Sequence, residues 1–309
     1  MNWRLLARGM VLVLALGPAG ACFGAEDVGL RISPVLQDVS LPANKPSVSY
    51  GVTIANNTGV DQAFRLAVRD FGSLDESGGV AFLGDPASEF VQAHGLSGWM
   101  SLDKSSVTVP VGGKIQVVVT IRNDDKLRLG GHYGVLTAEA LTAPGTPASS
   151  TRVGVTQVLS SLFLVVKDGS PPPNLRLLSQ VLGGNSLWHL PDGVFQRFED
   201  DGDVHVVPRG IITITDPLGR MVERGVMNED SGNILPGSIR RFQTPLVSIA
   251  WASLPGRYTI TSAYRYDGKL DTQVSTSMFW YVGTGGVVIG VFALLLVLAG
   301  GLTWWLRRR

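Results

Sequence analysis

The stretch Val48-Ser49-Tyr50-Gly51-Val52-Thr53-Ile54 alternates apolar residues with small or polar ones. Side chains of a β-strand point alternately to the two faces of a sheet, so this pattern predicts a strand with one buried face. The same period of two returns in Phe64–Val68 and in Ile115–Ile121. Turn-forming residues separate these segments, as in Asn56-Asn57-Thr58-Gly59. Short strands with such turns predict an antiparallel β-sandwich.

The segment Val153–Lys167 is almost continuously apolar, which predicts a long central strand that closes a first domain. Periodicity alone does not separate such a strand from a buried helix. The valine content and the following Asp168-Gly169-Ser170-Pro171-Pro172-Pro173 favour a strand and then a stiff linker. We therefore expect a first sandwich over residues 28–167 and a linker over 168–174.

Residues 175–279 repeat the same style. Val204 and Val206 flank His205, and Leu254-Pro255-Gly256-Arg257 precedes the alternating segment Tyr258–Thr261. About 100 residues suit one immunoglobulin-like sandwich. The predicted fold class is thus all-β, with two tandem immunoglobulin-like β-sandwich domains followed by one C-terminal transmembrane helix.

The C-terminal segment 282–306 contains no charged side chain. About 25 residues at about 1.5 Å each give a helix of about 37 Å, enough to cross a hydrocarbon core of about 30 Å. Aromatic rings at both ends suit the headgroup regions, and the basic tail 307–309 favours a cytoplasmic C-terminus. The expected topology is a single-pass type I protein of the cell membrane. The predicted membrane anchor consists of Trp280, Tyr281, Trp304, Trp305, Arg307, Arg308 and Arg309.

The N-terminus has the pattern of a secretory signal peptide, which we place at residues 1–25. Arg4 and Arg8 precede the short apolar run Met10–Leu16, and Ala19-Gly20-Ala21 resembles a cleavage site. Cleavage after Ala21 would leave Cys22 first, as in a lipoprotein. The alternative is an ordinary signal peptide whose removal takes Cys22 with it.

The composition argues against several classes of function. The net charge is +1, so no strong field attracts nucleic acid. With a single cysteine the exported part has no internal disulfide or thiolate metal site, and the four histidines lack metal-ligand spacing. No catalytic motif is visible, and no cofactor is expected.

Three features remain as candidate sites. The acidic run Glu199-Asp200-Asp201-Gly202-Asp203 could hold Ca²⁺ through oxygen ligands, but a solvated hairpin loop between Phe198 and Val204 is the favoured interpretation. Trp99 and Trp188 each offer a ring that could stack on a sugar or fill a core. We keep both tryptophans as candidate ligand residues.

A series of motifs in the first domain resembles a known family. It consists of Ile32-Ser33-Pro34-Val35, Lys45-Pro46, Val52-Thr53-Ile54-Ala55-Asn56-Asn57-Thr58, Pro110-Val111-Gly112-Gly113-Lys114 and Gly130-Gly131-His132-Tyr133-Gly134-Val135. The series resembles the peptidoglycan-binding domain of the bacterial WxL-interacting proteins over residues 28–167. This resemblance implies an immunoglobulin-like domain that binds the cell wall.

These observations favour a non-enzymatic, membrane-anchored protein of the cell envelope. Its expected partners are peptidoglycan or another cell-wall polymer, a surface protein, and the lipid bilayer through its single span. An alternative is a protein resembling an envelope assembly chaperone, since pilus chaperones use similar sandwiches. An anchored hydrolase is the third hypothesis, and it needs catalytic groups dispersed along the chain.

Overall fold

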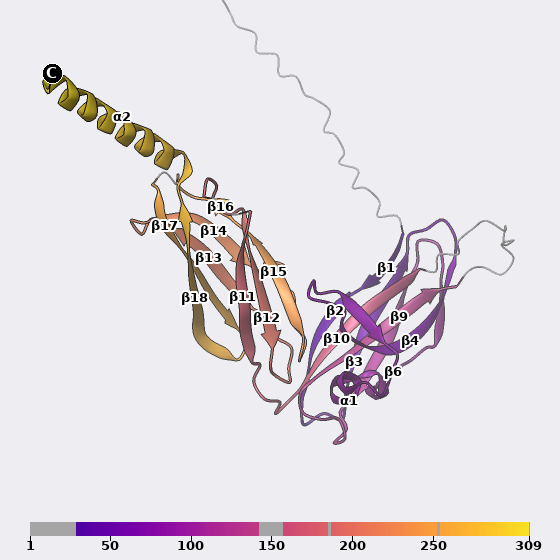
Figure 1. Cartoon of the computed structure of the whole chain (residues 1–309). Helices are drawn as coiled ribbons and strands as arrows, with labels where there is room; N and C mark the ends of the chain where they lie inside the picture. The colour runs from indigo at the N-terminus through magenta and orange to yellow at the C-terminus, as the bar shows by residue number, and fades with distance from the viewer. Residues whose placement is uncertain (1–28, 142–156, 185–186, 252–253, 309) are drawn as a thin grey trace, which may run out of the picture.

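The computed structural model describes residues 29–141, 157–184, 187–251 and 254–308. Within them the chain forms two β-sandwiches in tandem and a C-terminal helix (Figure 1). The fold class predicted from the sequence is therefore confirmed. The predicted signal peptide and Cys22 lie outside the described residues.

The first sandwich packs two mainly antiparallel sheets. One sheet has the order β1 (Leu30–Ser33), β3 (Ser47–Asn56), β8 (Lys114–Arg122), β6 (Met100–Leu102). The other has the order β2 (Leu36–Leu41), β10 (Val158–Lys167), β9 (Gly131–Ala140), β4 (Gln62–Ser73), β5 (Val80–Leu83), and β7 (Ser106–Val109) also pairs with β4. A short helix α1 (Glu89–His94) and one 3₁₀ turn (Ser97–Trp99) connect β5 to β6.

The chain changes sheets between β1 and β2, at the cis peptide bond Ser33–Pro34. β1 pairs with β3 in the first sheet, whereas β2 pairs in parallel with β10 in the second. This crossing places β2 at the edge of its sheet, beside only part of β10.

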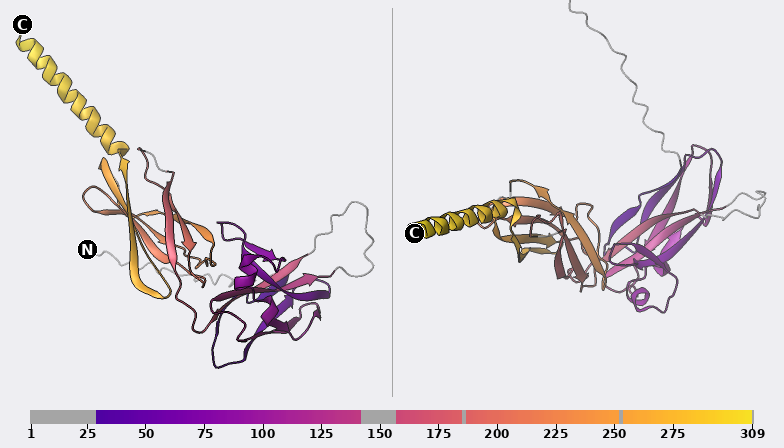
Figure 2. Two further views of the ribbon diagram at one scale, coloured as in Figure 1. Left: turned by 60° about the horizontal axis from the view of Figure 1, so that its bottom comes forward. Right: turned by 45° about the horizontal axis from the view of Figure 1, so that its top comes forward.

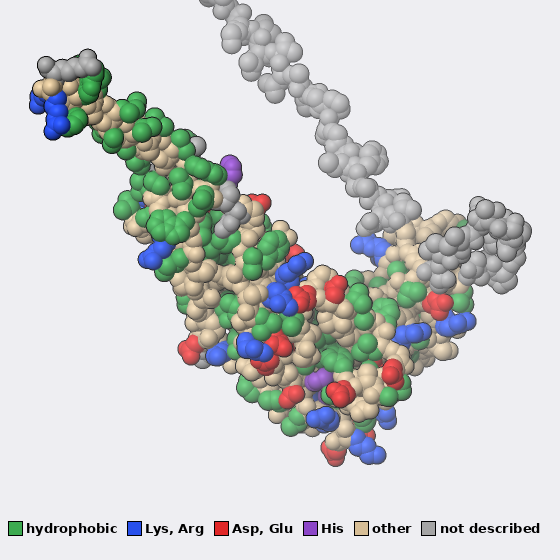
Figure 3. All heavy atoms as spheres, in the orientation of Figure 1, with side chains coloured by type: hydrophobic (Ala, Val, Ile, Leu, Met, Phe, Trp, Pro, Cys, Tyr) green, Lys and Arg blue, Asp and Glu red, His purple; other side chains and the backbone are tan. Residues whose placement is uncertain are grey.

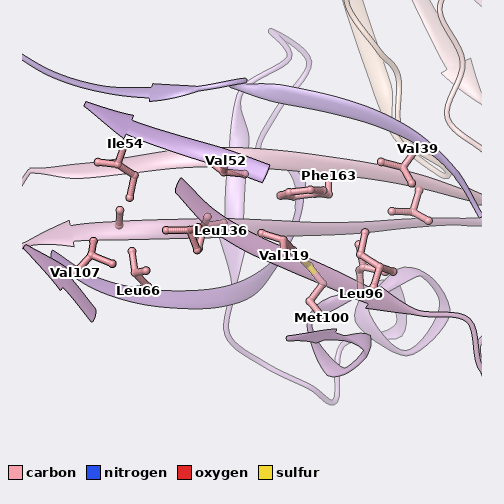
Figure 4. Packing of buried hydrophobic residues seen from close by; sticks show 14 of the residues in the cluster. Val39, Val52, Ile54, Leu66, Leu96, Met100, Val107, Val119, Leu136 and Phe163 are labelled. Atoms are coloured by element: carbon pink, nitrogen blue, oxygen red, sulfur yellow. The ribbon is translucent and has the colours of Figure 1, made fainter. Parts of the chain in front are cut away.

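The core of the first domain is built from the alternating positions that the sequence predicted to face inward. Val52, Ile54 and Val119 are fully buried in one cluster (Figure 4). Phe64 and Val117 are fully buried in the same cluster. Phe163 of β10 also lies in this cluster, so the apolar segment before the linker is a strand and not a helix from Val158 onward. Residues 153–156 of that predicted strand lie outside the described residues.

The second sandwich has a three-stranded and a five-stranded sheet. The first has the order β11 (Leu175–Gly183), β12 (Gly193–Asp200), β15 (Ile239–Pro245). The second has the order β16 (Val247–Ser248), β14 (Met221–Met227), β13 (Arg209–Thr215), β17 (Gly256–Tyr266), β18 (Lys269–Tyr281). Ile212, Ile214, Tyr258 and Ile260 are fully buried between the sheets.

Val204-His205-Val206 departs from the prediction. The alternation predicted a strand, but the segment forms only an isolated bridge between Val206 and Ile234. All three side chains are buried. The physical reason is that this segment faces the first domain, so both of its sides are covered.

Helix α2 (Gly283–Arg307) follows β18 directly and projects from the far end of the second domain (Figures 1 and 2). Its segment Gly285–Arg307 is long and apolar enough to cross a membrane, with a mean hydropathy of 2.5, and none of it is buried against the protein.

Candidate functional site: the groove between the two domains

A pocket of about 480 Å³ opens where the two domains meet. Its floor is an apolar cluster that joins Phe71 and Leu164 of the first domain to Leu235 of the second. Leu36 and Val80 at the rim are partly exposed. The remaining lining comes from Gly72, Ser73, Gly78, Gly79, Leu162, Asp230, Ser231, Gly232, Asn233, Ser238 and Arg240. This surface suits an apolar segment of a partner better than a small polar molecule.

One wall of the groove carries the cation Arg240. Its guanidinium lies 5.3 Å from the ring centre of Phe242, and its Nη1 donates to the Asn233 carbonyl oxygen at 2.6 Å. Among the described residues no carboxylate forms an ion pair with it. Burial lowers the pKa of Arg240. A carboxylate that entered the groove would therefore find a partly desolvated cation.

In the first domain, the edge of strand β10 is only partly covered by β2 beside this groove. β9 pairs with β10 along its whole length, but β2 reaches only from Lys167 back to Leu162. The Leu162 N–H donates to the Val35 carbonyl oxygen at 2.8 Å, at the last covered position. In the described part of the chain, Val158–Ser161 has a strand neighbour on one side only. Such an edge can accept an additional strand.

Main-chain and side-chain bonds fix the angle between the domains. The Tyr133 hydroxyl accepts a hydrogen bond from the His205 N–H at 2.9 Å, and the Gly131 N–H donates to the Asp203 carbonyl oxygen at 2.7 Å. On the other side Arg197 Nε donates to Glu76 Oε2 at 2.7 Å. Burial raises the pKa of the Tyr133 hydroxyl well above its ordinary value. The groove is thus held open by two separate sets of contacts.

Only part of the acidic run near these contacts is the solvated loop that the sequence favoured, since Asp201 and Asp203 are exposed outside any strand. Glu199 and Asp200 end β12, and the Asp200 side chain is fully buried. Its Oδ1 accepts from the Gly202 N–H at 2.8 Å, while Oδ2 has no hydrogen-bond partner. Burial, with Asp201 and Asp203 nearby, raises the pKa of Asp200 to about 7. In the ranges that the structure describes, no three His, Cys, Asp or Glu side chains are grouped to hold a metal ion.

The two candidate tryptophans lie apart from each other and from the groove. Trp99 is partly buried against the core of the first domain, with the Arg122 guanidinium 5.7 Å from its ring centre. Trp188 is exposed in the loop between β11 and β12, at the end of the second domain next to α2. Sequence reasoning did not find the groove, because its lining comes from segments far apart along the chain.

The predicted anchor residues divide into two groups. Trp304 and Trp305 are exposed on α2, and the Arg308 guanidinium lies 3.9 Å from the Trp304 ring centre. Trp280 is exposed on β18, but Tyr281 is buried with its ring centre 5.1 Å from that of Tyr258. Tyr281 therefore fills a protein core rather than a headgroup region, which differs from the prediction. Arg307 is the last residue of α2, and Arg309 lies outside the described residues.

Comparisons with known proteins give structural matches only. No protein-family model matches the chain, and no curated protein does. Among solved structures, a chaperone–tip adhesin complex of CFA/I fimbriae is 12% identical, with a TM-score of 0.42, over 83% of this chain and 100% of that one. The complex of the SafB chaperone with the SafA pilin of Salmonella enterica is 9% identical, with a TM-score of 0.39, over 84% of this chain and 98% of that one. The CsuC–CsuE chaperone–tip subunit complex of Acinetobacter baumannii is 10% identical, with a TM-score of 0.39, over 81% of this chain and 98% of that one.

The resemblance to WxL-interacting proteins is wrong, since no family model matches and the solved structures named above are fimbrial chaperone complexes. The motifs behind it serve the fold: Gly112 takes a positive φ in a turn, and Gly130 packs against the Asp203 carbonyl oxygen between the domains. Turns of this kind occur in many sandwiches. Peptidoglycan binding rested on this resemblance and is withdrawn with it.

Proposed function

We propose that this chain is a non-enzymatic, membrane-anchored protein of the cell envelope that holds an exported protein partner, in the manner of an assembly chaperone. This was the alternative hypothesis from the sequence. The observation that carries it is the half-covered edge of β10, at Val158–Ser161, beside the apolar groove. The matched chaperones were solved with a pilin or a tip adhesin. We propose the same class of partner, an exported surface subunit.

The partner would add a strand to the free part of β10. Val158 is 47% exposed, and Leu162 and Leu164 continue the same outward face into the groove. Main-chain hydrogen bonds at a sheet edge supply affinity that does not depend on sequence, and side-chain pockets supply specificity. A partner strand with alternating apolar residues would place them over Leu162 and Leu36. Arg240 would pair with a carboxylate at the end of that segment.

Binding at this edge also explains why the partner would need a chaperone-like protein before it is assembled. An unpaired strand edge with an apolar face aggregates when it is left in water. The contacts of Tyr133 and Glu76 keep the groove open before the partner arrives, so less order is lost on binding. We place the groove on the outer side of the membrane, with the C-terminus in the cytoplasm, on the basic tail after α2.

The test is site-specific photo-cross-linking in cells that make the full chain. A photoreactive amino acid replaces Val158, and a matched one replaces Val181, which is 58% exposed on the edge strand β11. We expect Val158 to cross-link to a strand segment of an exported protein, and Val181 to give no such product. In the same cells Ser160→Pro, which removes a main-chain donor at the free edge, should abolish the Val158 product. Equal products at both positions would contradict the proposal.

A further inference from the structure

The end of the second domain next to α2 carries an unusual set of exposed apolar side chains. We call this set the membrane-proximal rim. Several members are more than half exposed, and Trp251 reaches 90%. The rim consists of Leu187, Trp188, Leu218, Ile249, Trp251 and Trp280.

Strand register brings these residues to one end of the domain although they come from four separate segments. Gly183 pairs with Gly193, and Gly193 pairs with Pro245, so the loops that hold Trp188 and Ile249 are neighbours. Gly256 pairs with Tyr281, at the base of α2. Figure 3 shows hydrophobic side chains gathered over this end of the domain, whereas charged side chains gather toward the groove.

No linker separates the membrane-proximal rim from α2. The N–H groups of Val282 and Gly283 donate to the Leu187 carbonyl oxygen at 2.7 and 3.1 Å. α2 therefore starts while the chain is still bonded to a rim loop. If α2 spans the bilayer, this loop has no linker with which to stand away from it.

The length of α2 sets how deep the start of the helix, and the membrane-proximal rim beside it, would lie in the bilayer. Its 25 residues extend about 37 Å, whereas the hydrocarbon core is about 30 Å and the bilayer with headgroups about 40 to 45 Å. With Trp304 and Trp305 in one headgroup region, the first turn of α2 lies in the other. Tryptophan and leucine side chains at that depth are favourable, because one part of the headgroup region is apolar and another is wet.

We infer that the membrane-proximal rim inserts into the headgroup region of the bilayer and is a second, peripheral contact of the protein with lipid. This inference rests on the proposed membrane insertion of α2, but it does not depend on the groove. It assigns to six loop and strand residues the role that the sequence gave to Trp280 and Tyr281 alone. The rim fixes the domain upright on the membrane, where α2 by itself would let it tilt.

The experiment uses the full chain in vesicles of phosphatidylcholine and phosphatidylglycerol, with Cys22→Ser so that one introduced cysteine carries an environment-sensitive fluorophore. Leu218→Cys and Trp251→Cys label the rim. Val274→Cys, which is 62% exposed on β18 of the same domain, is the matched control, and Leu296→Cys reports insertion of α2. Lipids that bear a spin label near the top of the acyl chain quench fluorophores in the headgroup region and are used for the rim and for Val274. Lipids that bear the label near the end of the acyl chain quench fluorophores at the bilayer centre, and these are used for Leu296, which lies in the middle of α2.

We expect quenching at both rim positions to exceed that at Val274 about twofold or more, with emission shifted to shorter wavelength. Quenching at Leu296 with rim values equal to that of Val274 would overturn the inference and leave the anchor standing. Absence of quenching at Leu296 as well would overturn the anchor and the rim together.

Discussion

The buried carboxyl of Asp200 should make the stability of the second domain depend on pH. Burial raises its pKa from 3.8 to about 7, so between these values the folded state binds a proton that the unfolded state has lost. Stability from this group is therefore complete below about pH 4 and falls as the pH rises toward 7. At about 1.36 kcal/mol for each unit of pKa, the loss amounts to about 4 kcal/mol.

Replacing Asp200 by Asn should remove this dependence. The amide keeps the oxygen that accepts from the Gly202 N–H, and it cannot ionise. We expect Asp200→Asn to be more stable than the natural chain above pH 7, and about equal to it or slightly less stable near pH 4. Glu223 contributes a second part, because burial near Asp192 raises its pKa to about 7. Glu223→Gln should remove that part independently.

The assay is urea unfolding of the full chain in one detergent, at several values between pH 4.5 and 8.5, followed by circular dichroism. Glu229→Gln, at an exposed carboxylate of the same domain, is the control and should leave the curve of stability against pH unchanged. The reasoning is refuted if Asp200→Asn and the natural chain lose stability in parallel between pH 5 and 7. That result would mean that Asp200 ionises freely in the folded state.

Three further predictions concern the core of the first domain, the contact between the domains, and α2. Phe163→Ala removes a fully buried ring from the core of the first domain and should cost about 3 to 5 kcal/mol of unfolding free energy, whereas Val181→Ala at an exposed position should cost under about 1 kcal/mol. Tyr133→Phe leaves the buried His205 N–H without its acceptor and should cost about 1 to 3 kcal/mol in the same urea assay; an unchanged midpoint would contradict the assigned bond. Ending the chain after Tyr281 should move the protein from the membrane fraction to the soluble fraction, and continued sedimentation with membranes would count against α2 as the anchor.

The sequence predicted what depends on local pattern. Alternation placed Val52 and Ile54 on a buried face, since the period of a strand is visible in seven residues. The length and apolarity of α2 required no knowledge of the rest of the fold.

The groove could not be predicted in this way. Leu36 and Leu162 pair across more than a hundred residues, and Leu235 comes from another domain. No local pattern indicates which strands become neighbours. The strand expected at Val204–Val206 and the solvated position expected for Asp200 were wrong for a related reason, because the environments of these residues are produced by the contact between the domains and by the turn at Gly202.

The long hairpin of β17 and β18 spans the second domain from the interdomain linker to the base of α2. β18 runs 13 residues from Lys269, after the turn at Gly268 that lies against Pro173 of the linker, to Tyr281 at the base of α2. At about 3.4 Å per residue this strand measures about 40 Å, so if α2 spans the bilayer, the linker end of the second domain would stand at most about 40 Å from the base of α2. A polypeptide that emerges from the same membrane must expose about 12 extended residues before its leading end reaches that height. If the proposed partner binds at the groove, it would therefore do so through a segment that has already moved about this far from the membrane.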